Sequence, residues 1–345
     1  MELWVFDHSA FDLHRAPFLH PEAPERLAAA RRAIERLLFP VFRGEVPLAS
    51  PDVLSAVHSE SHWRMIASLP DEFGHLDPDT FYSPGSREAA LRAGGACAEM
   101  GTLLACKEAM AIALVRPPGH HAERERAMGF CLLNNVAIAV RSAQRQGVRR
   151  IAIVDWDAHH GNGTQSIFWE EPDVFFISLH GWPLYPGTGR PSEIGGGKGM
   201  GYTANLCLPP GSGPAEYEAA FKLLVLPLLE EFGPELIFVS AGFDAHRDDP
   251  LAHLKLDEEG FAWMASELRF LCQRTGTRMG WVLEGGYNLR ALEESLFASL
   301  CATLEKTKVP SRGLPPSPSA LRSIEDSRRA LAPFWSALAG EKPTR

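Results

Sequence analysis

The sequence predicts an α/β fold, a single domain whose mostly parallel sheet is covered by helices on both faces. Two observations support this prediction. Short apolar runs alternate with helix-like segments along most of the 345 residues, and each run ends at turn or polar residues. Strands that are buried on both faces form continuous apolar runs, and strands separated by helices pair in parallel.

Five apolar runs are predicted to be strands. In chain order they are Met110–Val115, Ile151–Val154, Val174–Ser178, Leu236–Val239 and Met279–Leu283. Helices are expected around them, several with apolar residues at three- and four-residue spacing. These are Pro24–Leu38, Glu88–Lys107, Leu133–Gln146, Ala215–Phe232, Asp257–Arg274, Arg290–Lys306 and Ala320–Ala339.

The domain organisation follows from the same pattern. Residues 1–306 are expected to form one catalytic domain, within which the glycine-rich stretch 187–201 is a long loop. Residues 307–345 are expected to be a linker rich in proline and serine, followed by a C-terminal helix that packs on the same domain.

Composition excludes several classes of protein. The net charge of −9, from 34 basic and 43 acidic residues, disfavours direct binding to nucleic acid. The six cysteines include no CxxC pair, which disfavours a cysteine zinc site or a disulfide framework. A signal peptide and a membrane-spanning run are not visible, so a cytoplasmic location is expected. The oligomeric state is left open.

Polar residues follow the predicted strands in a regular way. They are His120 and His121, then Asp155, Asp157, His159 and His160, then Ser178 and His180, then Asp244 and His246, then Glu284 and Tyr287. Ligands bind outside the carboxyl ends of strands in open parallel sheets. Five polar clusters at such ends therefore predict one convergent site.

A divalent metal site is the first chemistry that these residues suggest. In extended backbone, Asp155, Asp157 and His159 would share a face, and Asp244 could complete the set. Three protein ligands and an open position are typical of catalytic zinc, although an oxygen-rich set also suits iron or manganese. The alternative is a turn in which Asp and His side chains bind backbone amides.

Acid–base catalysis is the second chemistry that these residues suggest. Beside a metal, His120 and His121 could supply the base and the acid that amide hydrolysis needs, with Asp155 and Asn162 as their orienting partners. Tyr287 could donate a hydrogen bond to a developing oxyanion. Taken alone, the histidines could be a surface pair and the tyrosine a half-buried side chain.

Several blocks of sequence carry a family resemblance. They are residues 116–122 (RPPGHHA), 129–135 (GFCLLNN), 155–165 (DWDAHHGNGTQ), 185–189 (YPGTG), 240–246 (SAGFDAH) and 283–288 (LEGGYN). In this order they resemble the signature blocks of the arginase/deacetylase superfamily, and within it the histone deacetylase and acetylpolyamine amidohydrolase branch. The resemblance covers roughly residues 6–304. Asn162 and Tyr287 together are most similar to class II histone deacetylases and their bacterial relatives.

The resemblance implies a fold, ions and residue roles. The sheet would have eight parallel strands, Zn²⁺ would bind Asp157, His159 and Asp244, and His121 would act as base and then acid. His120, paired with Asp155, would give electrostatic support, and Tyr287 would polarise the amide carbonyl. Gly129, Phe130 and Tyr185 would line a narrow substrate channel. Structural K⁺ would lie near Asp155, Asp157, His159, Ser178 and Leu179, and a second monovalent cation near Phe168 and Val174.

The implied reaction releases acetate from an acetylated primary amine, foremost Nε-acetyl-lysine in a protein or peptide. Polyamine-selective relatives carry an acidic residue where this chain has Leu251, which weakens the alternative of an acetylated small amine such as an acetylpolyamine. An arginase-type ureohydrolase with two manganese ions is a further alternative that Asn162 disfavours. The remaining one is a non-catalytic binder of acetyl-lysine.

Overall fold

A single sheet of eight parallel strands forms the centre of the computed structural model, which describes residues 2–305 and 308–339. From one edge to the other, the strands are β2 (Val41–Arg43), β1 (Leu3–Phe6), β5 (Met110–Ala113), β10 (Arg278–Leu283), β9 (Leu236–Ala241), β6 (Ile151–Asp155), β7 (Val174–Gly181) and β8 (Thr203–Leu208). A separate antiparallel pair joins β3 (Gly74–His75) to β4 (Phe81–Tyr82). The predicted fold class and the eight-stranded sheet are confirmed.

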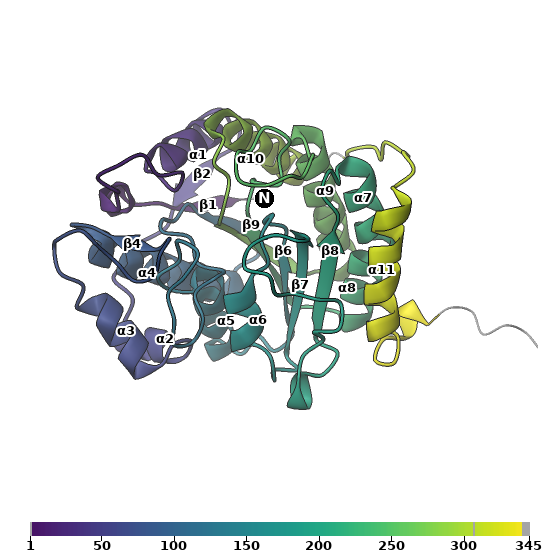
Figure 1. The fold of residues 1–345 in the computed structure, drawn as a ribbon, viewed down its shortest axis with the longest axis horizontal. Coiled ribbons are helices and arrows are strands. Elements are labelled where there is room, and N and C mark those ends of the chain that lie inside the picture. The colour runs from purple at the N-terminus through teal and green to yellow at the C-terminus, as the bar shows by residue number, and fades with distance from the viewer. Residues whose placement is uncertain (1, 306–307, 340–345) are drawn as a thin grey trace, which may run out of the picture.

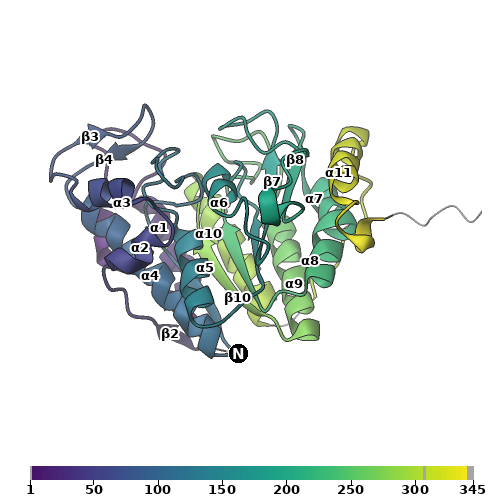
Figure 2. The same ribbon diagram turned by 90° about the horizontal axis from the view of Figure 1, so that it is seen from below.

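Helices cover the two faces of this sheet. Those described are α1 (Glu25–Glu35), α2 (Pro51–Ser55), α3 (Glu60–Ala67), α4 (Ser86–Cys106), α5 (Asn135–Arg145), α6 (Asn162–Ile167), α7 (Pro214–Ala220), α8 (Leu226–Phe232), α9 (Glu258–Thr275), α10 (Leu289–Leu304) and α11 (Pro318–Leu331). Figure 1 shows α1, α9 and α10 on one side of the sheet and α4 and α5 on the other, and Figure 2 shows the same layers from below. Apart from the edge strand β2, the strands between them are almost wholly buried, as the continuous apolar runs predict.

Side-chain caps fix where several of these helices begin. Asn134 accepts a hydrogen bond from the amide of Ala137 at the start of α5, and Asn288 does the same for α10. Each cap satisfies an amide that has no partner within its own helix. Both asparagines follow a strand-end loop of the site, so the caps also fix where those loops join the helices.

Two predicted helices differ in the structure, and proline explains both. The predicted helix 215–232 is divided into α7, a wide turn at Phe221–Val225 and α8, with the amide of Leu226 bonded five residues back to Phe221. Pro227 cannot donate to the helix and crowds the preceding turn, which the wide turn accommodates. The predicted helix 320–339 ends at Leu331, because Pro333, two residues later, has no N–H group with which to continue the helical hydrogen bonds.

Helix α11 covers the edge strand β8. The hydroxyl of Ser327 donates to the carbonyl of Asn205 at 2.6 Å, and the indole of Trp335 donates to the carbonyl of Gly201 at 2.7 Å. The Trp335 ring also stacks on Phe175 at 4.9 Å. The Ser327 contact satisfies a carbonyl of β8, which would otherwise present an open edge, and the Trp335 contact satisfies a carbonyl in the turn before that strand. The predicted division after residue 306 lies outside the described residues and stays a prediction.

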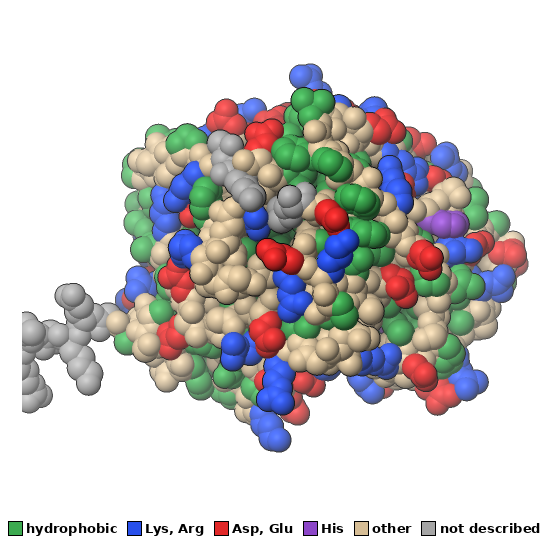
Figure 3. Space-filling model, turned by 180° about the vertical axis from the view of Figure 1, so that it is seen from behind, with side chains coloured by type: hydrophobic (Ala, Val, Ile, Leu, Met, Phe, Trp, Pro, Cys, Tyr) green, Lys and Arg blue, Asp and Glu red, His purple; other side chains and the backbone are tan. Residues whose placement is uncertain are grey.

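The strand order brings the predicted polar clusters to one edge. Strands β5, β10, β9, β6 and β7 are consecutive neighbours in the sheet, and they are the five strands after which those clusters come. On the face opposite to that in Figure 1, acidic and basic side chains are interspersed (Figure 3). Among the helices that the structure describes, none has the length and apolar character needed to cross a bilayer.

Candidate active site

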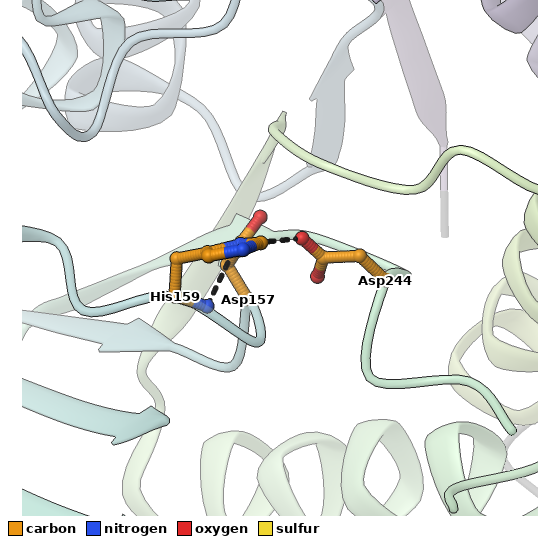
Figure 4. Close-up of side chains that lie close together, drawn as sticks. All are labelled: Asp157, His159 and Asp244. Atoms are coloured by element: carbon orange, nitrogen blue, oxygen red, sulfur yellow. Dashed lines mark hydrogen bonds and ion pairs between the residues drawn. The ribbon is translucent and has the colours of Figure 1, made fainter. Parts of the chain in front are cut away.

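Three side chains from two strand ends converge on one point. Asp157 and His159 follow β6, and Asp244 follows β9. The Nδ1 atom of His159 lies 3.1 Å from Oδ1 of Asp157 and 2.9 Å from Oδ2 of Asp244. Figure 4 shows the edge of the His159 ring facing the Asp244 carboxylate, with Asp157 beside it. One potential ligand atom from each residue lies within 4.8 Å of the others, so the group could hold a metal ion.

The backbone fixes both carboxylates. Oδ2 of Asp157 accepts from the amide of Gly285 at 2.8 Å, and Oδ1 of Asp244 accepts from the amide of Ala158 at 2.8 Å. A Cβ atom at Gly285 would lie 2.4 Å from Oδ2 of Asp244 and 2.5 Å from Oδ2 of Asp157. The glycine therefore lets the loop after β10 approach both carboxylates closely, with one oxygen of each left toward His159.

The charges of this group favour a cation. Both carboxylates are fully buried. Burial, followed by the charge of Asp157, raises the pKa of Asp244 to about 7. Burial lowers the pKa of His159, but hydrogen bonds to Asp157 and Asp244 outweigh that effect and raise it to about 10. An oxygen-rich donor set around one imidazole is a reasonable set of ligands for zinc, iron or manganese.

The two adjacent histidines have different partners. Nδ1 of His120 lies 3.0 Å from Oδ2 of Asp155, and Nδ1 of His121 lies 2.7 Å from Oδ1 of Asn162. Their rings are 4.0 Å apart. These are the two orienting partners that the sequence suggested, one charged and one neutral.

The two imidazoles therefore differ in their protonation state. Burial lowers the pKa of His120, but the nearby charges of Asp157 and Asp155 outweigh it and raise the pKa to about 10. Burial, together with the positive charges of His120 and His159, holds the pKa of His121 well below its ordinary value. His121 is therefore neutral at pH 7, with Nδ1 donating to Asn162 and Nε2 unprotonated.

A buried glutamate positions the turn that carries both histidines. Oε2 of Glu284 accepts from the amides of Gly119 at 2.7 Å and His120 at 3.1 Å. Burial raises the pKa of this carboxyl to about 7. Glu284 follows β10 and the histidines follow β5, so this contact connects two neighbouring strand ends.

A channel of about 240 Å³ leads to His121 and His159. Its lining consists of Asp79, His121, Gly129, Phe130, His159, Leu184, Tyr185, Leu251 and Tyr287. Gly129, Phe130 and Tyr185, which the resemblance places along the channel, are among them, and so is Leu251. A Cβ at Gly129, whose φ is +57°, would lie 2.4 Å from Cδ2 of His121, and Phe130 itself has a φ of +67°. Strained backbone of this kind is concentrated at functional sites.

Tyr287 faces the same channel from the loop after β10. Oδ2 of Asp249 accepts from the backbone amide of Tyr287 at 2.7 Å. The ring packs edge-on against Phe130 at 6.0 Å, and the guanidinium of Arg26 lies 5.0 Å from its centre. Burial holds the pKa of the phenol well above its ordinary value. The hydroxyl therefore stays protonated and can donate.

Comparison with known proteins decides the family. The family model for the histone deacetylase domain matches residues 20–303. The chain belongs to the histone deacetylase family. A solved structure described as the HDA15 HD domain has a TM-score of 0.89 and 35% identity, and the match covers 98% of this chain and 97% of that one.

Two curated members of the histone deacetylase family match along most of this chain. Histone deacetylase 15 of Arabidopsis thaliana is 38% identical, over 96% of this chain and 61% of its own length. Polyamine deacetylase HDAC10 of Homo sapiens is 38% identical, over 92% of this chain and 50% of its own length. The chain thus spans about half to three-fifths of these relatives. The family resemblance is confirmed, and the protein is a deacetylase-family hydrolase.

The residues expected to surround monovalent cations lie at two places in this deacetylase-family fold. Asp155 pairs with Ser178 between β6 and β7, and Leu179 is the next residue along β7. This group adjoins Asp157 and His159 in the chain. Phe168 directly follows α6, and Val174 begins β7, four residues before Ser178.

Two further residues contribute to the histone deacetylase-like site and were not predicted from the sequence. Asp79 lines the channel from the β3–β4 turn, and its Oδ1 accepts from the amide of Gly129 at 3.3 Å. Asp249 positions Tyr287 from the loop after β9. Neither directly follows a predicted strand. The only available signal for Asp249 is its place two residues before Leu251.

Proposed function

We propose that this protein is a zinc-dependent deacetylase that hydrolyses Nε-acetyl-lysine in proteins or peptides and releases acetate. One observation supports this most strongly. At the end of an apolar-walled channel, a neutral imidazole and a protonated phenol face the Asp157–His159–Asp244 group. Amide hydrolysis needs a base, an oxyanion donor and an electrophile; the side chains that would supply the first two lie beside the group that would hold the third.

Asp157, His159 and Asp244 are proposed to hold the zinc ion. When bound, zinc would supply Lewis-acid polarisation of the acetyl carbonyl and of the attacking water. The chain supplies the rest of this centre, because backbone amides restrain one oxygen of each carboxylate and leave the other toward His159. Metal analysis of the purified protein, with zinc, iron and manganese compared in activity, tests the choice of ion.

His121 is proposed as the general base and then the general acid. Its Nδ1 donates to Asn162, so the Nε2 lone pair is free to accept a proton from water and return it to the leaving amine. His120, held by Asp155, is proposed to provide positive charge and to orient the water rather than to transfer the proton. If His121→Ala retained near-normal turnover, this assignment would be wrong.

Tyr287 is proposed to donate a hydrogen bond to the oxygen on which negative charge develops. Its backbone is fixed by Asp249, and its ring is held by Phe130 and Arg26, so the hydroxyl is preorganised. Preorganised donors of this kind contribute strongly in sites from which water is excluded.

The walls of the channel suit an extended, uncharged acyl-lysine side chain. Phe130 and Tyr185 provide aromatic surface, and Leu251 places an apolar side chain in the same lining. A second candidate substrate, an acetylated polyamine, is supported by the similarity to Polyamine deacetylase HDAC10. Turnover of an acetyl-lysine peptide and of N-acetylputrescine under the same conditions distinguishes the two.

We also propose structural K⁺ beside Asp155, Asp157, His159, Ser178 and Leu179, as the family resemblance implies. The proposal is supported by the burial of Asp155, Asp157 and Ser178 next to the metal group, where carboxylate and hydroxyl oxygens suit a hard cation. Replacing K⁺ by tetramethylammonium should lower both thermal stability and turnover, whereas no change in either would contradict it.

A further inference from the structure

A chain of two hydrogen bonds connects His121 to a carboxylate that no proposed role has used. Oδ1 of Asn162 lies 2.7 Å from Nδ1 of His121, and Nδ2 of Asn162 donates to Oε1 of Glu123 at 2.8 Å. We propose that Glu123 is a positioning residue, which orients the Asn162 amide so that His121 keeps its proton on Nδ1 and presents an unprotonated Nε2 to the substrate. This inference rests on the proposed function of His121 as the base.

The need for such a residue follows from the chemistry of asparagine. An amide has an acceptor end and a donor end that are nearly equal in size. If the Asn162 amide were turned around, its NH₂ group would face Nδ1 of His121. That nitrogen would then have to accept, the proton would move to Nε2, and the imidazole could not act as a base. A carboxylate cannot donate, so Glu123 selects the productive orientation.

Among the acceptors near Nδ2 of Asn162, Glu123 should favour the productive amide orientation most strongly. The other partners of Nδ2 are the carbonyl of His121 at 3.5 Å and the sulfur of Met128 at 3.4 Å. A hydrogen bond to a charged acceptor is about twice as strong as one between neutral groups, and sulfur is a weak acceptor. Removing Glu123 should therefore leave the productive orientation of the amide in only a minority of the molecules.

The backbone holds Glu123 in reach of Asn162. Its amide donates to the carbonyl of Arg126 at 2.9 Å, and its carbonyl accepts from Nδ1 of His58 at 3.0 Å. The side chain is half-buried, and it lines a second cavity of about 320 Å³ together with Asn162 and Gln165. Glu123 therefore lies behind the catalytic histidine, away from the substrate channel, and acts on His121 only through Asn162.

The first test is kinetic, with an acetyl-lysine peptide and zinc-loaded protein. Glu123→Ala should lower kcat by about 10-fold, as expected for one hydrogen bond to a charged group, with KM unchanged. Glu123→Gln keeps an acceptor oxygen and should retain at least about half of the turnover. Glu125→Ala removes the same charge from an exposed position on the same loop and serves as the control. Equal losses in the Ala and Gln variants would overturn the proposal.

Testing Glu123→Ala in a second variant distinguishes a role in orienting Asn162 from a general effect on the fold. In Asn162→Asp, both side-chain oxygens accept, so no group is needed to orient them. Adding Glu123→Ala to that variant removes the repulsion between the two carboxylates, so kcat should not fall by more than about 2-fold. A loss as large as in the wild-type background would show that Glu123 only supports the loop. Should Glu123→Ala fail to fold, Glu123→Met keeps the side-chain length without an oxygen.

The tautomer itself gives a readout that does not need activity. In ¹⁵N-histidine-labelled protein, with His121 assigned by its loss in His121→Gln, Nδ1 should be protonated in the wild type. Glu123→Ala should show transfer of that proton to Nε2 in most, though not all, of the molecules. An unchanged tautomer would overturn the proposal. If the wild type releases no acetate, the proposed function fails, while this spectrum still decides the role of Glu123.

Discussion

Removal of one oxygen atom, in Tyr287→Phe, separates the proposed oxyanion donor from everything else that this side chain does. The backbone of residue 287 is held by Asp249, and the ring is held by Phe130 and Arg26, none of which depends on the hydroxyl. Among the described residues, the phenol oxygen has no hydrogen-bond partner. The free energy of unfolding should therefore change by less than about 0.5 kcal/mol.

The effect on catalysis should be much larger. Loss of one preorganised oxyanion donor typically lowers kcat by about 100- to 1,000-fold, or about 2.7–4 kcal/mol of transition-state stabilisation. The assay is steady-state release of acetate from an acetyl-lysine peptide, with thermal unfolding measured in parallel. Tyr202→Phe is the matched control, because Tyr202 packs against Phe175 and Trp335, outside the channel lining. A kcat within about 3-fold of the wild type would refute the oxyanion role.

Three further predictions concern the metal group, the pH dependence of folding and the substrate. Gly285→Ala should weaken zinc binding at least about 10-fold in a chelator competition, because its Cβ would lie 2.4 Å from Oδ2 of Asp244, and an unchanged affinity would contradict this. Burial lowers the pKa of His14 and His58 to about 3, so below pH 6.5 the unfolded chain binds protons that the folded one does not. Urea unfolding should therefore show that the free energy of unfolding decreases as the pH falls from 6.5 toward 3, by about 2 kcal/mol per histidine at pH 5. In His58→Gln, the free energy of unfolding should depend less steeply on pH. An unchanged dependence would show that His58 does not contribute to it. Leu251→Glu should raise kcat/KM for an acetylpolyamine by about 10-fold through attraction to its ammonium groups, and an unchanged value would remove Leu251 from substrate selection.

Local sequence patterns predict the centre of this fold well and its edges poorly. Strands β5, β6, β7, β9 and β10 are continuous apolar runs, because both of their faces are covered by helices. Strands β1 and β2 are only four and three residues long. In β8, Thr203 and Asn205 interrupt the apolar pattern, and the α11 hydroxyl that bonds to Asn205 comes from more than 100 residues away. These strands were expected only through the family resemblance.

In the site too, local sequence patterns predict some of the residues and miss others. Residues on the loops that follow the predicted strands, such as Asp157, His121 and Asp244, could be predicted because parallel strands end at one edge of the sheet. Their supporting residues could not. Asp249 and Glu123 matter through one or two hydrogen bonds formed only when distant loops fold together, and residue type and spacing do not report such contacts.

We propose that this chain hydrolyses an acetyl-lysine amide with one zinc ion at Asp157, His159 and Asp244. The most direct measurement is acetate release from an acetyl-lysine peptide before and after removal of metal by a chelator, followed by titration with Zn²⁺. We predict that turnover is lost on removal and returns in proportion to added zinc, reaching its plateau at about one ion per chain. Full turnover by the metal-free protein would contradict the account.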